Sequence, residues 1–197
     1  YELYGNIGQK NINPEKSETN EISGEYNFSE NIKISSTAYR TRMKNRIKIK
    51  SDWSAYENKV PDTTQEGVES KITFLGEYQN IDLISHFSKS RTDTGGPNSR
   101  RPDISYGIDY SKKFKIENYG IFDLYLSHRF IGDHIDWTGS QNAFVKSIDL
   151  VDMSIRKNWG GNIISVNLTN LLNERYEKPA TYSQDGRQLN FSLKKSY

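Results

Sequence analysis

Apolar and polar residues alternate along most of this chain with a period of two. Residues 164–169 read ISVNLT, so that Ile164, Val166 and Leu168 alternate with polar neighbours. The same alternation runs through residues 21–28, 68–74, 103–110, 122–129 and 151–156. A period of two places successive side chains on opposite faces of a β-strand. Because no segment keeps a helical period, the pattern predicts an all-β chain.

We expect about nine antiparallel strands, long enough to cross a membrane when tilted. They cover residues 17–28, 31–43, 65–76, 80–91, 102–114, 120–132, 143–157, 161–173 and 187–197. The connections alternate between tight turns, at 29–31, 77–79, 115–119 and 158–160, and long polar loops, near 44–64, 92–101, 133–142 and 174–186. Short turns at one end and long loops at the other are typical of an outer-membrane β-barrel. The sequence therefore predicts an antiparallel meander, the C-terminal portion of a transmembrane β-barrel, forming an open curved sheet.

Aromatic residues gather at the predicted tight turns. They are Phe28, Tyr78, Phe114, Tyr119 and Trp159, and the final residue, Tyr197, is expected at the same end of the sheet. Aromatic rings favour the membrane–water interface, where an apolar body and a polar tip are both accommodated. We therefore expect a girdle of rings at the turn end, with Tyr197 closing it.

The composition leaves a second fold open. Only 34% of the residues are hydrophobic, the mean hydropathy is −0.84, the net charge is +2 and there is no Cys. A soluble β-sandwich also alternates, although we expect it to have fewer long strands and loops less regularly sorted by length. A charge this small gives no argument for binding nucleic acid. Because the chain opens with Tyr1 and has no signal-peptide pattern, we expect it to be a piece of a longer protein.

Several motifs, in the same order along the chain, resemble the C-terminal part of TonB-dependent outer-membrane receptors. Near the start, NINPEKS at residues 11–17 precedes Glu21 and Gly24. EGVES at 66–70 and NSRRPDISYGIDY at 98–110 also look like family signatures. Near the end come NLTNLLN at 167–173, Tyr176, Gly186-Arg187 and a last strand that finishes on an aromatic. The final Tyr departs from the Phe that is more usual in the family.

The resemblance implies a barrel of about 22 strands around an N-terminal plug domain. On this reading residues 1–197 are part of the barrel, and the plug and the first strands lie outside them. The implied partners are outer-membrane lipid, the TonB complex acting through the N-terminal part, and the barrel assembly machinery. The implied function is uptake of a scarce nutrient, a cobalamin or a ferric siderophore, across an outer membrane. The short loops look most like the cobalamin-receptor branch. A non-transporting structural or adhesive barrel stays open as an alternative.

The long loops carry the candidate ligand contacts. These are Trp53, Tyr56, Arg100, Arg101, Trp137, Tyr176, Tyr182 and Arg187. Aromatic rings beside arginines suit a large, partly apolar ligand that is anionic or a metal chelate. Packing among loops and an outer aromatic girdle would explain the same residues.

No catalytic, cofactor or resident metal site is predicted. His86, His128 and His134 share no metal-ligand spacing, and no nucleophile is placed beside a base. The carboxylates Asp123, Asp152 and Glu69 lie on the polar side of their strands. We expect them to face a barrel lumen, paired with Arg129, Arg156 and Lys71.

The last strand is predicted to guide barrel assembly. Leu189, Phe191, Leu193 and Tyr197 form one apolar stripe, which the resemblance implies is read as an insertion signal. An exposed strand edge can pair with the sheet of another protein, and alternate side chains then set the register. Changing Tyr197 to Asp is expected to lower outer-membrane abundance more than changing Ser196 to Asp.

Overall fold

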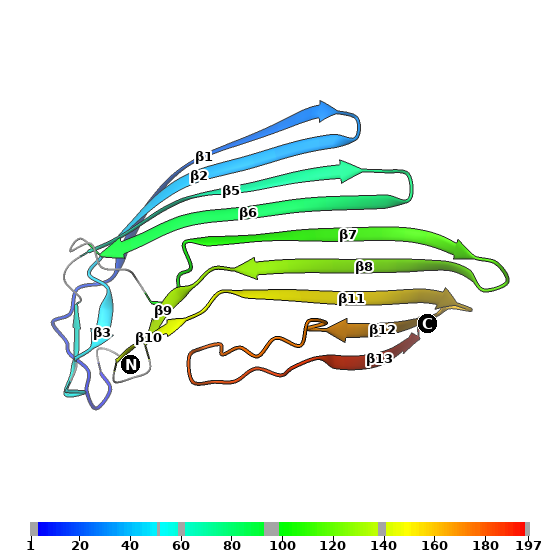
Figure 1. Cartoon of the computed structure of the whole chain (residues 1–197). Helices are drawn as coiled ribbons and strands as arrows, with labels where there is room; N and C mark the ends of the chain where they lie inside the picture. Colours follow the sequence, from blue (N-terminus) through cyan, green and yellow to red (C-terminus); the bar gives the residue numbers. More distant parts are fainter. Residues whose placement is uncertain (1–3, 51, 59–61, 93–98, 138–140, 196–197) are drawn as a thin grey trace.

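The computed structural model describes residues 4–50, 52–58, 62–92, 99–137 and 141–195. Nine long strands form one antiparallel sheet in the order β1-β2-β5-β6-β7-β8-β11-β12-β13. Their bounds are β1 Lys16–Ser29, β2 Ile32–Lys44, β5 Thr63–Leu75, β6 Gln79–Thr92, β7 Ile104–Ile116, β8 Gly120–Ile131, β11 Ile148–Trp159, β12 Asn162–Thr169 and β13 Gln188–Lys195. The sheet is a curved, open wall (Figure 1). The predicted fold class is confirmed, and the nine strands lie in one sheet rather than in the two facing sheets of a sandwich.

The register gives the sheet two chemically different faces. One row of cross-strand partners runs Ile81, Tyr110, Leu126, Met153, Leu168 and Leu189. The next row runs Thr73, Asp82, Asp109, Ser127 and Asp152. Because adjacent residues point to opposite faces, the first row builds an apolar face and the second a polar one. We call them the outer face and the inner face.

The outer face is open to its surroundings. Ile22, Phe191 and Leu193 expose 76%, 73% and 72% of their surface. Among the described residues, the buried hydrophobic ones are Ala55 and Ala180 alone. A water-soluble domain would bury its large apolar side chains in a core, so this face needs an apolar medium or a partner. No helix in the described ranges is long and apolar enough to cross a membrane.

The turns and loops separate as predicted. The tight turns lie together at one end of the sheet, where β13 also ends, and the longer connections lie at the other (Figure 1). At the turn end, Phe28, Tyr78, Tyr119 and Trp159 are 61–67% exposed. Phe114 stacks on Phe122 with 5.7 Å between the ring centroids. The predicted cluster of rings is therefore present at this end, although Tyr197 lies outside the described residues.

The loop end holds structure that the sequence did not predict. Two small hairpins form there, from β3 Ile47–Ile49 with β4 Tyr56–Asn58 and from β9 His134–Trp137 with β10 Asn142–Val145. The single strand predicted at 143–157 is wrong, because the chain changes partner within it. Residues 142–145 pair with β9, and the chain then enters β11, which pairs with β8 and β12.

Candidate functional site

Ion pairs cross the inner face between neighbouring strands. Lys71 Nζ lies 3.0 Å from Asp82 Oδ2, and Thr73 donates its hydroxyl to Oδ1 of the same carboxylate at 2.7 Å. Arg129 Nη2 lies 2.7 Å from both carboxylate oxygens of Asp109. In each pair the two residues are diagonal neighbours, because Lys71 is opposite Ile84 and Arg129 is opposite Gly107. Diagonal neighbours lie within reach of long side chains.

Gly107 makes room for one of these pairs. A Cβ atom built on Gly107 would lie 2.8 Å from Cδ and Nη1 of Arg129. The Arg129 side chain therefore crosses the backbone of β7 to reach Asp109 on the same strand. This close approach explains a glycine in the middle of a strand, where glycine is otherwise unfavourable.

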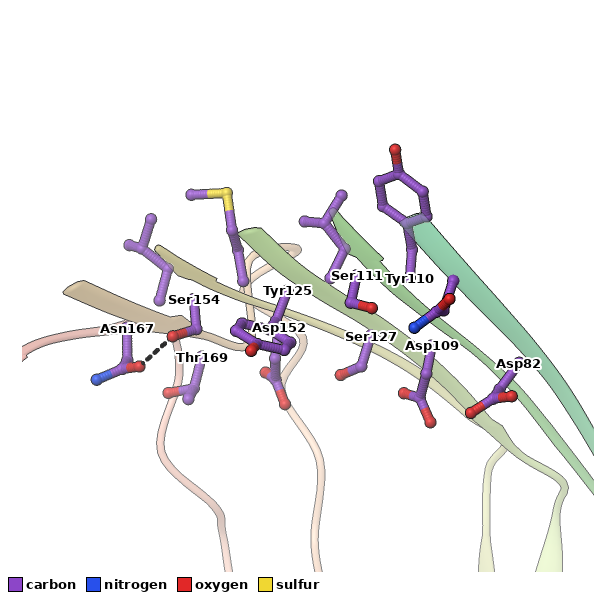
Figure 2. A pocket seen from close by; sticks show the side chains of 14 residues that line it. Asp82, Asp109, Tyr110, Ser111, Tyr125, Ser127, Asp152, Ser154, Asn167 and Thr169 are labelled. Atoms are coloured by element: carbon purple, nitrogen blue, oxygen red, sulfur yellow. Dashed lines mark hydrogen bonds between the residues drawn. The ribbon is translucent and has the colours of Figure 1, made fainter. Parts of the chain in front are cut away.

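The inner face is hollowed near its middle, over strands β6 to β12. The hollow has a volume of about 390 Å³ and is lined by residues that include Asp82, Asp109, Asp152 and Asn167. Figure 2 shows these three carboxylates on one side of the sheet and Tyr110 on the other. Ser154 donates a hydrogen bond to Asn167 Oδ1 at 2.7 Å. The inner-face side chains around this hollow thus include three carboxylates and a hydrogen bond between strands.

The predicted partners of three carboxylates are wrong. Glu69 contacts His86 Nδ1 at 3.2 Å, and Lys71 contacts Asp82 instead. Asp152 accepts a hydrogen bond from the backbone N–H of Asn170 at 2.8 Å. Lys71 reaches Asp82 along a diagonal between strands, and Asp152 contacts a residue of the β12–β13 connection. The alternation of residues along a strand predicts neither kind of contact.

The arginines assigned to those carboxylates also have other partners. Arg129 pairs with Asp109, as described above. Arg156 lies over the ring of Tyr125, 5.4 Å from its centroid. Asp123 is directly opposite Arg156 in the sheet, yet the structure forms no ion pair between them within its described part.

Asp136 joins three connections at the loop end. Its side chain is 1% exposed, and Oδ1 accepts a hydrogen bond from Arg100 Nε at 2.5 Å. Oδ2 accepts the backbone N–H of Ala180 at 2.8 Å. The backbone N–H of Arg100 also donates to Ile135 O at 2.7 Å. One buried carboxylate therefore ties the β6–β7 connection, the β9–β10 hairpin and the β12–β13 connection together.

The NLTNLLN motif organises the β12–β13 connection. Asn170 is 6% exposed and has a φ of +50°, a left-handed conformation that Asn tolerates. Its side chain donates to the carbonyl oxygens of Glu174 and Asp185 and accepts the Glu174 N–H. Asn173 Oδ1 accepts the N–H of Arg187 at 3.0 Å. The motif thus folds the chain back toward β13.

Gly186, the first residue of the Gly-Arg pair, fits closely against this turn. A Cβ atom at that position would lie 2.6 Å from Asn173 Oδ1. A side chain there would displace the group that accepts the Arg187 N–H.

The NINPEKS motif supports the β3–β4 hairpin. Asn13 donates its N–H to Asn58 Oδ1, and Asn58 Nδ2 donates to Asn13 O, both at 2.8 Å. Glu15 Oε1 accepts the N–H of Ile47 at 2.7 Å. This motif therefore has a structural role at the loop end.

The predicted ligand contacts are spread over separate connections. Trp53, at a φ of +59°, is 67% exposed between β3 and β4, and Tyr182 is 65% exposed. Tyr56 donates its N–H to Ile7 O at 3.1 Å, and Tyr176 O accepts the N–H of Gln184 at 2.9 Å. Arg187 is exposed.

The remaining candidates are Trp137, Arg100 and Arg101. Trp137 belongs to β9, and its side chain lies outside the described residues. Arg100 and Arg101 line one hollow together with Arg46. Arg46 and Asp136 were not predicted from the sequence, because neither stands in a recognisable motif.

Asp52 fixes the turn that carries Trp53. Ser54 donates its hydroxyl to Asp52 Oδ1 at 2.7 Å and its N–H to the same oxygen at 3.0 Å. These bonds hold the pKa of the Asp52 carboxyl below its usual value, and the bond from the Ser54 hydroxyl has the larger effect.

The three histidines are engaged separately. His86 contacts Glu69, His128 Nε2 lies 2.7 Å from Asp149 Oδ1, and His134 Nδ1 lies 3.2 Å from Gly132 O. In the part of the chain that the structure describes, no group of His, Asp or Glu residues could hold a metal ion.

The comparison with protein families identifies the class. A family model described as TonB dependent receptor-like, beta-barrel matches residues 1–171. The chain therefore belongs to this family, and the resemblance drawn from its motifs is confirmed. No curated protein matches the chain.

Solved structures share the fold at low sequence identity. The pyoverdine outer membrane receptor FpvA from Pseudomonas aeruginosa PAO1, bound to pyoverdine, matches with a TM-score of 0.78, 18% identity and 100% of this chain. The ferric yersiniabactin uptake receptor FyuA from Yersinia pestis matches with a TM-score of 0.73, 17% identity and 91% coverage. The ferric-catecholate import receptor Fiu from E. coli K12 matches with a TM-score of 0.70, 14% identity and 96% coverage. This chain spans 32%, 29% and 29% of those three chains.

Proposed function

We propose that this chain forms part of the barrel wall of an outer-membrane receptor that takes up a ferric siderophore. The observation that supports this most strongly is the two-faced sheet in a chain of the TonB-dependent receptor family. An apolar outer face matches lipid, and a polar, ion-paired inner face matches an aqueous or protein-filled lumen. The turn-end rings then lie at the periplasmic interface, and the β3–β4 and β9–β10 hairpins face the outside of the cell.

The ligand class is supported by the similar structures. They are a pyoverdine receptor, a ferric yersiniabactin uptake receptor and a ferric-catecholate import receptor. With identities of 14–18%, these likenesses carry the fold alone. The ferric ligand is thus our proposal for this chain, and cobalamin is the alternative that the test must separate.

We also propose how the rest of the receptor completes the barrel and couples it to energy. In the longer protein, earlier strands pair with the free edges of β1 and β13, since open edges in lipid leave backbone groups unsatisfied. A plug domain fills the lumen and couples through TonB to the inner membrane. The assembly machinery would read the apolar stripe Leu189, Phe191 and Leu193 on β13. We propose transport, not catalysis, as the activity.

The test is substrate uptake by cells that express the full-length protein in a strain without other receptors. We expect saturable uptake of at least one ⁵⁵Fe-labelled siderophore, and a protonophore should abolish it. Uptake of labelled cobalamin with no iron uptake would overturn the ligand class. Outer-membrane localisation without uptake of either would favour a structural or adhesive barrel.

A further inference from the structure

A second hollow lies on the inner face at the loop end of strands β2, β5 and β6. Its volume is about 470 Å³, and Met43, Arg46, Thr63, Ser90, Arg100 and Arg101 are among the residues that line it. Met43 and Thr63 are cross-strand partners. Both share the inner face with Glu69 and Tyr39, because they are an even number of residues away along their strands. The hollow therefore lies at the loop end of the inner face, the end that the proposed function places outside the cell.

The lining is strongly cationic. Its described lining residues include three arginines and no Asp or Glu, which together carry a formal charge of +3. Asp136 offsets one of these charges by its hydrogen bond to Arg100 Nε, and 3 − 1 leaves +2. The Arg100 side chain is still 59% exposed, so much of its guanidinium remains accessible.

Among the described residues, two of the three arginines have no carboxylate partner. Arg46 Nη1 donates to Thr63 Oγ1 at 3.3 Å. Over the described ranges, neither Arg46 nor Arg101 forms an ion pair. By contrast, Arg42, Arg91 and Arg129 are each paired with an aspartate on a neighbouring strand or connection. The paired arginines stabilise the wall, whereas Arg46 and Arg101 have donors available to another molecule.

Two of the lining residues that carry hydroxyl groups are buried. Thr63 is 0% exposed and Ser90 is 2% exposed. A guanidinium presents its N–H donors in a planar fork that matches carboxylate and other paired anionic oxygens. The exposed guanidinium donors therefore form a site for an anion and disfavour a neutral or cationic group.

We propose that this arginine hollow binds the anionic oxygens of the transported chelate, such as carboxylate or catecholate oxygens. The inference rests on the proposed function and names the charge class of its ligand. Arg46 and Arg101 bind the anion directly, and Asp136 positions Arg100 beside them. A free phosphate could occupy the same site through the same chemistry, so the experiment includes it as a competitor.

The experiment measures binding of three probes to the purified full-length receptor. They are ferric citrate, a ferric tris-catecholate and a neutral ferric trihydroxamate. We expect an anionic probe to bind most tightly, with an affinity that falls as salt is raised. In the Arg46→Gln, Arg101→Gln double variant, its Kd should rise about tenfold or more, because charge-assisted hydrogen bonds are lost. Inorganic phosphate at millimolar concentration should compete only weakly if the chelate is the true ligand.

Arg42→Gln is the matched control. Arg42 lies four residues before Arg46 but pairs with Asp62, so its Kd should stay within about twofold of the wild-type value. A double variant with unchanged affinity, tightest binding of the neutral probe, or full displacement by phosphate would each overturn this inference. None of these results would overturn iron uptake itself, which fails only if no ferric chelate is transported. Salt dependence in the unmutated receptor tests the proposal even if the double variant does not fold.

Discussion

The carboxylate of Asp136 is buried between the guanidinium of Arg100 and the backbone N–H of Ala180, residues 36 and 44 positions away. A buried carboxylate is costly unless it is paired and hydrogen-bonded, and here it has both kinds of partner. The arrangement makes three connections at the loop end into one unit.

Removing this carboxylate should loosen the β12–β13 connection. In the full-length protein, Asp136→Ala leaves the Ala180 N–H without its acceptor. We expect amide hydrogen exchange around Ala180 to accelerate by about tenfold or more, the equivalent of one charge-assisted hydrogen bond. Exchange measured by mass spectrometry checks this. Asp133→Ala is the control, since Asp133 is exposed on the same connection; equal acceleration in both variants would contradict the role of Asp136.

Asn170 provides a second prediction, about stability. Its side chain makes three hydrogen bonds to the backbone of the β12–β13 connection. We expect Asn170→Ala to lower the free energy of unfolding of the full-length protein by about 1–3 kcal/mol, because three backbone groups of this connection lose their partners. Urea titration in lipid vesicles measures the change. Asn142→Ala, at an exposed position of β10, should alter it little, and similar losses for both would refute the assignment.

The two faces of β12 provide a third prediction. Val166 is opposite Ile155 and Phe191, whereas Asn167 is opposite Ser154 and Asn190. An arginine on the lipid face costs about 2–4 kcal/mol near the bilayer midplane, and lumen positions tolerate charge. Val166→Arg should therefore destabilise the folded barrel in vesicles by that amount, and Asn167→Arg should have little effect. If Asn167→Arg destabilised the barrel more than Val166→Arg, the assignment of the lipid and lumen faces would be wrong.

The sequence predicted the strands well because the period of two extends over whole strands. The positions of the tight turns and the polar side of each strand followed from the same pattern. The structure shows, for example, Val166 and Asn167 on opposite faces as expected. Where the pattern was short, as in the three- and four-residue strands β3 and β9, it gave no signal.

Side-chain partners could not be predicted in the same way. Lys71 reaches Asp82 and Arg129 reaches Asp109 along diagonals, and a one-residue difference in register would have changed both pairs. Asp136 meets Arg100 only because two connections come together at the loop end of the sheet. Arg46 likewise lies beside Arg100 and Arg101 only in the folded chain, so the residues next to it in the sequence could not predict its place in the arginine hollow.

The proposal that this sheet is a barrel wall is tested most directly by measuring the environment of successive residues along β12. Single cysteines at residues 163–168 of a cysteine-free full-length receptor can carry a spin label, and its collisions with oxygen report exposure to lipid. We predict maxima at Ile164, Val166 and Leu168 and minima at Ile163, Ser165 and Asn167, since alternate side chains face lipid and lumen. A profile without this alternation, or with the maxima at Ser165 and Asn167, would contradict the proposal that this sheet is the wall of a membrane-spanning barrel.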